Sequence, residues 1–498
     1  MRWRISLLVT IALMPILLWG CSPRTVGLRH DVQQTQQVAL YHYVIKENVD
    51  LEGKTIRLPK GGSLVFENGT ISNGTIVFNH TKISGNSPSF RDVNLKGILA
   101  NQTVYSNWFK SSAEGSDYLT SVIKTCCTSS TDFVFNEGRY RFTEPIYLFG
   151  RCNLSGEGDA NLIVDMGKAP FFLLAGNDTI GGKNPITWHG KIDNLKFIVN
   201  RGSFNYFVNL INVQDCEISN CLFDLSGKGV NCSNKVIASV NNANYSNPSK
   251  GERILIKNNT IKKHSSEENR NNGEPIGVES RTDVLIENNT IWNARDDLGV
   301  HNCSNVTVKG NKVYAYDGRI YVSNSTDVTI ENNTINYVFP KVTGMGVYVG
   351  VEQGYDCISE RIDIKGNIVD YSKSAHVATY GIRVIGANYV NITNNTIKGS
   401  GKSRIALEYI EAKTSQKKGL LNAGYLVPQH VTIKGNKVSS LWIAGFAKFK
   451  IKDIKVVDNI IDNEVSITNS MVVFRDNQMR ANTKIYAAPT RNKNRYSK

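Results

Sequence analysis

Residues 284–291 read VLIENNTI, and close variants of this octapeptide recur through the second half of the chain. The other copies are ILIKNNTI at 254–261, VTVKGNKV at 306–313, VTIENNTI at 328–335, IDIKGNIV at 362–369, VNITNNTI at 390–397, VTIKGNKV at 431–438 and IKVVDNII at 454–461. Each copy has an apolar-x-apolar triplet, two residues, an asparagine, and an apolar residue two positions later. Such short, β-branched alternation predicts a strand rather than a helix.

The spacing of the repeats predicts how these strands are stacked. Asn289, Asn311 and Asn333 follow one another at intervals of 22 residues, and other intervals are longer. A unit of this size cannot bury its apolar side alone, so neighbouring units must stack along an axis. The asparagine tolerates a left-handed turn, and its amide can bond the equivalent amide in the next unit. We therefore expect an all-β fold, a right-handed parallel β-helix, over residues 106–480; a propeller or a sandwich fits less well.

The N-terminus has the features of a bacterial lipoprotein signal. Arg2 and Arg4 precede an apolar stretch, Ile5 to Trp19, that is too short to span a membrane, and Cys21 follows closely. We expect residues 1–20 to be removed and Cys21 to be lipidated. The protein would then be exported and anchored to the bacterial membrane, by preference the outer one. A plain secretory signal is the alternative.

Charge and cysteine content narrow the class of partner. The chain has 58 Lys and Arg against 43 Asp and Glu, a formal net charge of +15, which favours an acidic partner. Because export argues against nucleic acid and no nucleic-acid motif is present, we expect an anionic polysaccharide and no nucleic acid. The cysteines other than Cys21 show no zinc-ligand spacing. Most are expected to be buried, with Cys216 and Cys221 as the candidate disulfide pair.

The segment before the repeats resembles the entry of pectate-lyase-like β-helices. It contains Asn107-Trp108-Phe109, an expected short helix near Asp117 to Cys127, and Phe133-Val134-Phe135-Asn136-Glu137-Gly138-Arg139-Tyr140. In that superfamily a tryptophan-phenylalanine strand, a capping helix and a strand ending in Gly-x-Tyr begin the solenoid. The resemblance implies an N-terminal capping helix. Gly-rich strand fragments before it predict a small β-rich lead-in over 21–105, and the basic residues at the end of the sequence predict a basic tail over 481–498. The resemblance concerns the fold, since one fold serves many functions.

A third strand of each coil can be aligned across six coils. It reads IGVE at 276–279, LGVH at 298–301, IYVS at 320–323, VYVG at 347–350, IRVI at 382–385 and IALE at 405–408. With a period of two, the first and third positions face the core and the second and fourth face outward. We expect Gly277 and Gly299 to leave a floor on which a sugar ring can lie.

The outward positions of these strands predict a surface groove whose side chains can transfer protons and bind a carboxylate. Equivalent residues of stacked coils lie about 4.8 Å apart, so His301 is expected beside Glu279 and near Tyr321. A carboxylate orients an imidazole, a tyrosine exchanges protons, and an arginine binds a carboxylate through two bonds. The candidate catalytic residues are His301, Tyr321, Arg383 and Tyr348, and the candidate substrate-binding residues are Glu279, Asp297, Arg319, Glu408 and His376.

The favoured hypothesis is a polysaccharide lyase that cleaves a uronic-acid-containing chain by β-elimination, with chondroitin or hyaluronan first and alginate or pectin next. Arg383 or Ca²⁺ would neutralise the uronate, His301 would take the C5 proton, and Tyr321 or Tyr348 would protonate the leaving oxygen. The lysine or arginine base of many β-helical lyases is missing at the matching positions. Two alternatives stay open: a glycoside hydrolase that uses Asp296, Asp297 and Glu279, and a non-catalytic glycan-binding protein.

Overall fold

The computed structural model describes residues 41–111, 117–176, 187–239, 251–263, 273–294, 298–316, 318–338, 344–351, 357–373, 380–399, 404–411, 421–422, 425–443, 449, 451–480, 482–486 and 495–497. The chain divides into two compact units, Met1–Ala160 and Asn161–Lys498. The expected signal segment and the lipidation site Cys21 lie outside the described residues. Within the described part of the chain, no helix is both long enough and apolar enough to cross a membrane.

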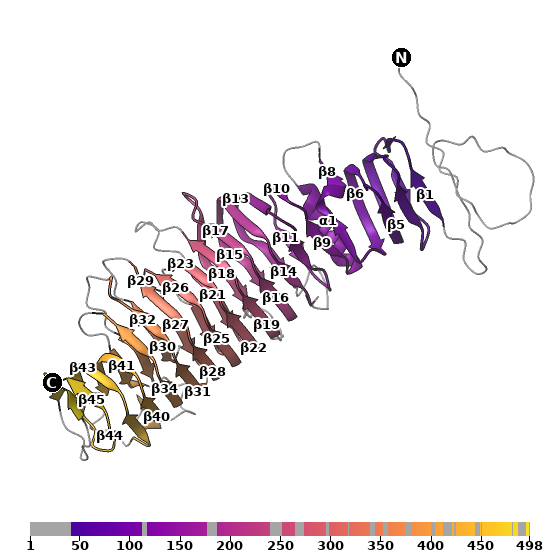
Figure 1. The fold of residues 1–498 in the computed structure, drawn as a ribbon. Helices are drawn as coiled ribbons and strands as arrows, with labels where there is room; N and C mark the ends of the chain where they lie inside the picture. Colours follow the sequence, from indigo (N-terminus) through magenta and orange to yellow (C-terminus); the bar gives the residue numbers. More distant parts are fainter. Residues whose placement is uncertain are drawn as a thin grey trace, which may run out of the picture. The chain divides into compact units, whose positions relative to one another are not determined.

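The first unit opens with a parallel sheet over the expected lead-in (Figure 1). Its strands pair in the order β1 (His42–Ile45), β4 (Ser63–Phe66), β5 (Ile71–Gly85), β6 (Phe90–Leu99) and β8 (Phe109–Lys110), while β2 (Val49–Asp50) and β3 (Thr55–Arg57) pair with β5. Phenylalanine rings from successive strands contact one another in its core. Phe66 and Phe90 meet edge-to-face with ring centroids 5.0 Å apart, and Phe90 and Phe109 stack with centroids 5.5 Å apart. The lead-in is therefore itself a small stack of parallel strands.

The expected capping helix is present as α1 (Asp117–Ser129). It packs against β6, because the Thr125 hydroxyl donates to the Leu95 carbonyl at 2.8 Å and the Leu99 amide donates to the Ser129 hydroxyl at 2.8 Å. The remaining elements of this unit are β7 (Thr103–Tyr105), a 3-10 turn (Ser106–Trp108), β9 (Asp132–Phe135), β10 (Gly138–Phe142), β11 (Ile146–Leu148) and β12 (Leu154–Gly156). Parallel pairing of β7 with β9 and of β9 with β12 begins the coils.

The second unit is a right-handed parallel β-helix, and each full coil contributes three strands (Figure 1). The first strands are β14 (Lys191–Asp193), β16 (Gln214–Ser219), β19 (Gly251–Lys257), β22 (Arg281–Glu287), β25 (Ser304–Lys309), β28 (Thr326–Glu331), β31 (Glu360–Lys365), β34 (Asn388–Thr393), β40 (Gln429–Lys434), β42 (Ile454–Val457) and β44 (Val473–Arg475). The second strands are β17 (Leu222–Leu225), β20 (Thr260–Lys263), β23 (Thr290–Ala294), β26 (Lys312–Ala315), β29 (Thr334–Tyr337), β32 (Ile368–Asp370) and β35 (Thr396–Lys398). The third strands are β18 (Asn231–Ser239), β21 (Glu274–Glu279), β24 (Leu298–His301), β27 (Ile320–Ser323), β30 (Met345–Gly350), β33 (Tyr380–Ile385) and β36 (Arg404–Glu408).

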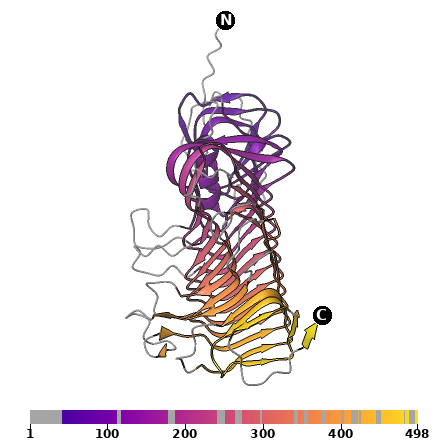
Figure 2. The ribbon, with the colours of Figure 1, turned by 90° about the vertical axis from the view of Figure 1, so that its left-hand side faces the viewer.

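In four coils one continuous strand takes the place of the separate second and third strands. These strands are β13 (Ala160–Ala175), β15 (Lys196–Leu210), β41 (Lys437–Ile443) and β43 (Ile460–Ile467). The last strands are β45 (Gln478–Arg480), β46 (Lys484–Tyr486) and β47 (Arg495–Ser497), and a small antiparallel sheet holds β37 (Ile410–Glu411), β38 (Leu421–Asn422) and β39 (Tyr425–Leu426). Figure 2 shows the strands of successive coils lying above one another. The triplets of the repeat form the first strands, as predicted.

The polar interior of the coil is a ladder of asparagine side chains, as the repeat predicts. Each amide nitrogen donates to the side-chain oxygen of the next asparagine at 2.9–3.0 Å, through Asn259, Asn289, Asn311, Asn333, Asn367, Asn395, Asn436, Asn459 and Asn477. The backbone amide of each asparagine donates to that same oxygen, and the ladder is almost fully buried. Every coil is thereby held in register with the next one.

One detail of the predicted turn was wrong. The left-handed backbone conformation belongs to the residue before each ladder asparagine, at Asn288 (φ 55°), Gly310 (φ 64°) and Asn332 (φ 55°). Glycine, asparagine or aspartate occupies this position in the coils of the ladder, because all three tolerate a positive φ. Two neighbouring residues therefore divide the two roles, and the ladder residue itself keeps an ordinary backbone.

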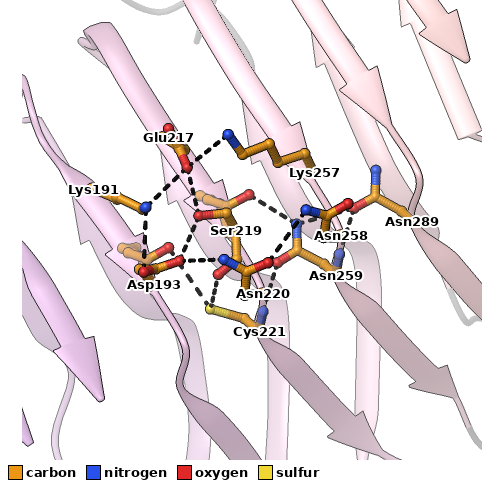
Figure 3. Close-up of polar contacts among 12 residues, drawn as sticks. Lys191, Asp193, Glu217, Ser219, Asn220, Cys221, Lys257, Asn258, Asn259 and Asn289 are labelled. Carbon is orange, nitrogen blue, oxygen red and sulfur yellow. Dashed lines mark hydrogen bonds and ion pairs between the residues drawn. The ribbon is translucent and has the colours of Figure 1, made fainter. Parts of the chain in front are cut away.

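Figure 3 shows how the ladder begins. Cys221 occupies the ladder position before Asn259, because its backbone amide donates to the Asn259 side-chain oxygen at 3.0 Å. Its thiol donates instead to the Ser219 carbonyl, at 3.1 Å. On the outer surface beside it, the Glu217 carboxylate lies between Lys191 at 3.2 Å and Lys257 at 3.3 Å (Figure 3). A buried thiol thus replaces the amide where the stack of asparagines starts.

The eight described cysteines are all free thiols, and seven of them are buried. The candidate pair, Cys216 and Cys221, does not form a disulfide. Burial raises the pKa of both thiols to about 12. They act as small apolar core residues, as expected for most of the cysteines.

Candidate functional site

The outer face of β21, β24, β27, β30, β33 and β36, here called the third-strand face, has the predicted register. Glu279 pairs with His301, His301 with Ser323, Gly299 with Tyr321, Tyr321 with Tyr348, and Tyr348 with Arg383. The alternate residues of these strands, such as Val300 and Val322, are fully buried in the core. The outward set therefore shares one face, and the alignment made from sequence is confirmed.

His301 lies at the start of this face and is held at both ring nitrogens. Nδ1 is 2.8 Å from the Ser323 hydroxyl, and Nε2 is 3.1 Å from Oε1 of Glu274. The residue is only 6% exposed. Glu279 is adjacent to His301 in register, as predicted. Glu274, which was not predicted, supplies a carboxylate that is hydrogen-bonded to Nε2.

Glu274 joins His301 to a lysine that the sequence analysis missed. The other Glu274 oxygen lies 2.8 Å from Nζ of Lys235, and both residues are buried. Burial raises the pKa of Glu274, but the hydrogen bond from His301 and the charges of His301 and Lys235 outweigh it, so the pKa is lowered. Burial likewise lowers the pKa of Lys235, and Glu274 reverses the effect, so that pKa is raised. The pair therefore stays ionised.

The two glycines on this face have a different role from the one expected. A Cβ atom on Gly277 would lie 2.0 Å from Oε2 of Glu274, and one on Gly299 would lie 2.5 Å from Nε2 of His301 and 2.7 Å from Oε1 of Glu274. The floor over these glycines is thus filled by the protein's own side chains. The prediction that a sugar ring lies there is wrong, and the glycines instead make room for the chain Lys235, Glu274, His301, Ser323.

Beyond His301 the face carries an alternation of guanidinium groups and aromatic rings, here called the arginine–aromatic row. Its members are Arg319, Tyr321, Tyr348, Tyr380, Arg383, Arg404 and Trp442. The Arg319 guanidinium carbon lies 4.9 Å from the Tyr321 ring centroid and 5.2 Å from that of Tyr348. The row is contiguous with His301, whose ring meets the Tyr321 ring edge-to-face at 5.0 Å.

The row continues across the next coils. The Arg383 guanidinium carbon lies 5.7 Å from the Tyr348 ring centroid and 4.6 Å from that of Tyr380. Arg404 lies 4.7 Å from Tyr380 and 3.8 Å from the ring of Trp442. Stacking of arginine on aromatic rings is favourable and fixes the orientation of the planar donors. Tyr380 and Trp442 are additions that the sequence analysis did not make.

Glu408 contacts Arg383 directly. Nε and Nη2 of Arg383 donate to Oε2 of Glu408 at 3.1 and 2.5 Å. The side chain of Arg383 is 22% exposed and that of Glu408 is 21% exposed, so the ion pair lies half-buried in the face. Burial, followed by the Glu408 carboxylate, raises the pKa of Tyr380. Glu408, expected to bind substrate, thus orients the arginine.

Of five other predicted residues, two lie on or beside the face and three lie outside the described residues. Asp297 and His376, expected to bind substrate, lie outside the described residues, as does Asp296. Glu279 and Arg319 lie on or beside the face as predicted, and both are partly exposed. Among the described residues, no group of three or more His, Cys, Asp or Glu side chains gathers closely enough to hold a metal ion.

Lys235 and Glu274 could not be placed on the face from the period of two. Glu274 lies two residues before Ile276, so the alternation assigns it to the core side of the strand. Lys235 pairs with Glu274 in register, while Ile237 pairs with Ile276. The contact of Glu274 with His301, over Gly277 and Gly299, is visible only in the structure.

Comparison with known proteins identifies the architecture. Residues 187–375 match the family model for a right handed beta helix region. Similar solved structures include the Dettilon tailspike protein gp208, at 16% identity over 77% of this chain and 67% of that chain, with a TM-score of 0.40. Another is the DFA-IIIase of Arthrobacter chlorophenolicus A6, at 11% identity over 66% of this chain and 89% of that chain, with a TM-score of 0.41. A third is the surface adhesin PfbA of Streptococcus pneumoniae, at 13% identity over 76% of this chain and 92% of that chain, with a TM-score of 0.42. A search of curated protein sequences finds no match.

These findings define a parallel β-helix protein with a polar, cation-bearing face along its third strands. The similar structures share little sequence with this chain, so their likeness concerns the fold. What the face does must be inferred from its own residues.

Proposed function

We propose that the third-strand face binds an anionic, uronate-containing polysaccharide and cleaves it by β-elimination. The observation that carries the proposal is the arginine–aromatic row, in which planar cationic donors alternate with ring faces over several coils. Guanidinium groups bind carboxylates through two parallel hydrogen bonds, and aromatic rings pack against the apolar faces of sugars. A row of this kind suits a polymer that carries a carboxylate on repeated sugar units.

The substrate class follows from charge. The chain's net charge of +15 favours a polyanion in solution as well as at the face. A glycosaminoglycan of the chondroitin or hyaluronan kind is the first choice, and alginate and pectin are next. We further propose that the protein is exported and held at the bacterial membrane, by preference the outer one, through a lipid on Cys21, where such polymers are accessible.

β-Elimination needs three functions on the face. Arg383 or Arg319 would neutralise the uronate carboxylate, which makes the C5 proton acidic. A base removes that proton, the C4–O bond breaks as the C4–C5 double bond forms, and an acid protonates the leaving oxygen. We assign the two proton transfers to Tyr321 and Tyr348, whose ring centroids lie 4.8 Å apart. Arg319, which lies over both rings, would stabilise the phenolate that acts as base.

His301 has a different role in this proposal from the expected one. Both of its ring nitrogens are already hydrogen-bonded, and the residue is buried. Its edge-to-face contact with Tyr321 makes it a positioning residue that fixes the first tyrosine of the row. The same observation favours the second candidate function, a glycan-binding protein without catalysis, since the only histidine on the described face has no nitrogen turned to solvent.

Hydrolysis through paired carboxylates receives less support from the described residues. Glu274 is ion-paired with Lys235 and its pKa is lowered, whereas a general acid needs a raised pKa. Glu408 is ion-paired with Arg383.

The test is an incubation of the purified protein with chondroitin sulfate, hyaluronan, alginate and polygalacturonate, with and without Ca²⁺, monitored by the ultraviolet absorbance of unsaturated uronate. We expect a rise on at least one polymer. Tyr348→Phe should then lose roughly 100-fold or more in rate, the usual contribution of one acid–base group.

The matched control is Tyr314→Phe, because Tyr314 stacks on Trp292 at 3.9 Å on the neighbouring β26 and lies outside the row. Binding without any unsaturated product would favour the non-catalytic function. Neither binding nor product on any of these polymers would refute both.

A further inference from the structure

A polar groove lies on a different surface of the β-helix from the third-strand face, on the outer face of the first strands β25, β28, β31 and β34. It encloses about 360 Å³ and is lined by Asn305, Asp327, Thr329, Arg361, Asp363, Tyr389 and Asn391. These strands lie side by side in the stack (Figure 1). None of these seven residues belongs to the third-strand face.

The groove has a local backbone cause. One residue near the start of each first strand has a left-handed backbone, at Asn305 (φ 52°), Asp327 (φ 56°), Arg361 (φ 54°) and Tyr389 (φ 52°). Pairing of the strands passes over these residues, since Thr326 pairs with Glu360 and Val328 with Ile362. Each such residue is a small interruption of the ladder, and its exposed side chain stands out from the sheet.

Two neighbouring members of this series turn away from each other. Arg361 reaches to the preceding coil, where its Nε and an NH2 nitrogen lie 2.6 and 2.8 Å from the two oxygens of Asp327. Tyr389 stacks on His430 of the following coil, with ring centroids 4.6 Å apart and planes at 9°. The space between Arg361 and Tyr389 is therefore open, although their coils are adjacent in the stack.

The floor of this opening is a row of short polar side chains in register. Thr329 pairs with Asp363 and Asp363 with Asn391. The Asn391 amide donates to Oδ1 of Asp363 at 2.8 Å. A hydroxyl, a carboxylate and an amide thus line the groove together with the Tyr389 ring, which is 50% exposed.

The chemistry of the groove differs from that of the arginine–aromatic row. The one guanidinium among the seven lining residues is paired with Asp327, while Asp363 contributes a carboxylate whose bonded partner is a neutral amide. The lining thus holds two carboxylates and one guanidinium, and this excess of negative charge disfavours an anionic ligand. A ligand rich in hydroxyl groups would find donors and acceptors at the floor and an apolar ring at the wall. The volume is at the low end for small-molecule sites and suits one or two sugar rings.

We propose that this groove is a second carbohydrate-binding site and that it takes a neutral oligosaccharide. The proposal does not depend on the function of the third-strand face.

The experiment is titration calorimetry of the purified protein with cellohexaose, laminarihexaose, mannohexaose and xylohexaose. We expect saturable binding of at least one of them. Tyr389→Ala and Asp363→Ala should each weaken that binding by about tenfold or more, since each removes a wall or floor contact. Because Tyr389 has a left-handed backbone, thermal unfolding should be recorded for each variant. Asn391→Ala tests the floor of the groove and leaves Tyr389 in place.

Two control variants make the outcome specific. Arg383→Ala, on the third-strand face, should leave binding of the neutral hexasaccharide unchanged, and so should Tyr147→Ala, which removes an exposed tyrosine from the first unit. Absence of binding to all four probes would overturn the proposal. Equal binding by wild type, Tyr389→Ala and Asp363→Ala would overturn it as well, because the sugar would then bind elsewhere.

Discussion

Replacing Asn311 by alanine should destabilise the β-helix far more than an exposed asparagine replacement does. The Asn311 side chain is fully buried, donates to the Ile286 carbonyl at 2.9 Å, and accepts from the backbone amide of Asn289 at 2.9 Å. Alanine leaves that amide and that carbonyl without these partners in the interior. At about 1–3 kcal/mol for each of these two unsatisfied buried groups, the expected loss is about 2–6 kcal/mol.

The assay is equilibrium urea denaturation followed by circular dichroism, with hydrogen exchange of strands β22, β25 and β28 to locate the change. Coils interact with their nearest neighbours, so the loss of protection should be centred on these strands. The control is Asn94→Ala, an exposed asparagine of β6 whose backbone is not left-handed, which should change stability by less than about 0.5 kcal/mol. An Asn311→Ala effect no larger than that of the control would refute the role given to the ladder.

Three further predictions concern the candidate site and the core. Gly299→Ala should lower the free energy of unfolding by about 1–3 kcal/mol and impair the third-strand face, because the new Cβ would meet His301 and Glu274. Gly167→Ala is the control, since its new Cβ would have no atom within 4 Å, and thermal unfolding should show it to be neutral. Glu274 has a lowered pKa in the folded protein, so it stabilises the fold above the ordinary glutamate pKa of about 4.3 and loses this effect as the pH falls through its folded value. The stability difference between wild type and Glu274→Gln, from urea midpoints, should therefore be largest near neutral pH and shrink in acid; a difference that grows in acid would contradict the assignment. In the native mature domain only Cys357 should react readily with a thiol reagent, because the other described thiols are buried. Burial also raises the pKa of Cys303 to about 12. Rapid reaction of several thiols before unfolding would show that the core is open.

Much of the fold was predictable because two patterns of different origin agree. The octapeptide marks the first strand and the turn after it, and the period of two in the third strand divides core from surface. Ile276, Leu298 and Ile320 aligned correctly for this reason, and their register placed Tyr321, Tyr348 and Arg383 in one row. Strand stacking converts a one-dimensional repeat into neighbours in space, which few other folds do.

The contacts made by long side chains were not predictable in the same way. Register places Glu279 beside His301, yet the imidazole turns along the strand over Gly299 and meets Glu274. The contact between His301 and Glu274 depends on the space left by Gly299 and on the charge of Lys235, which lies on the coil before Glu274. The left-handed residue was misplaced by one position because asparagine can perform either task, and VLIENNTI has two in succession. Trp442 was missed because β41 merges the second and third strands and follows no repeat boundary.

The central claim is that the arginine–aromatic row is the surface that binds an anionic polysaccharide. Its most direct test is the affinity of wild type and of the Arg319→Ala/Arg383→Ala double variant for hyaluronan and chondroitin oligosaccharides at fixed ionic strength. Lys309→Ala/Lys365→Ala, which removes two cations from the first-strand surface, is the control with a matched loss of charge. We expect the arginine double variant to bind at least about tenfold more weakly while the control binds as wild type does. Equal affinity of all three proteins, or equal losses in both variants, would contradict the claim.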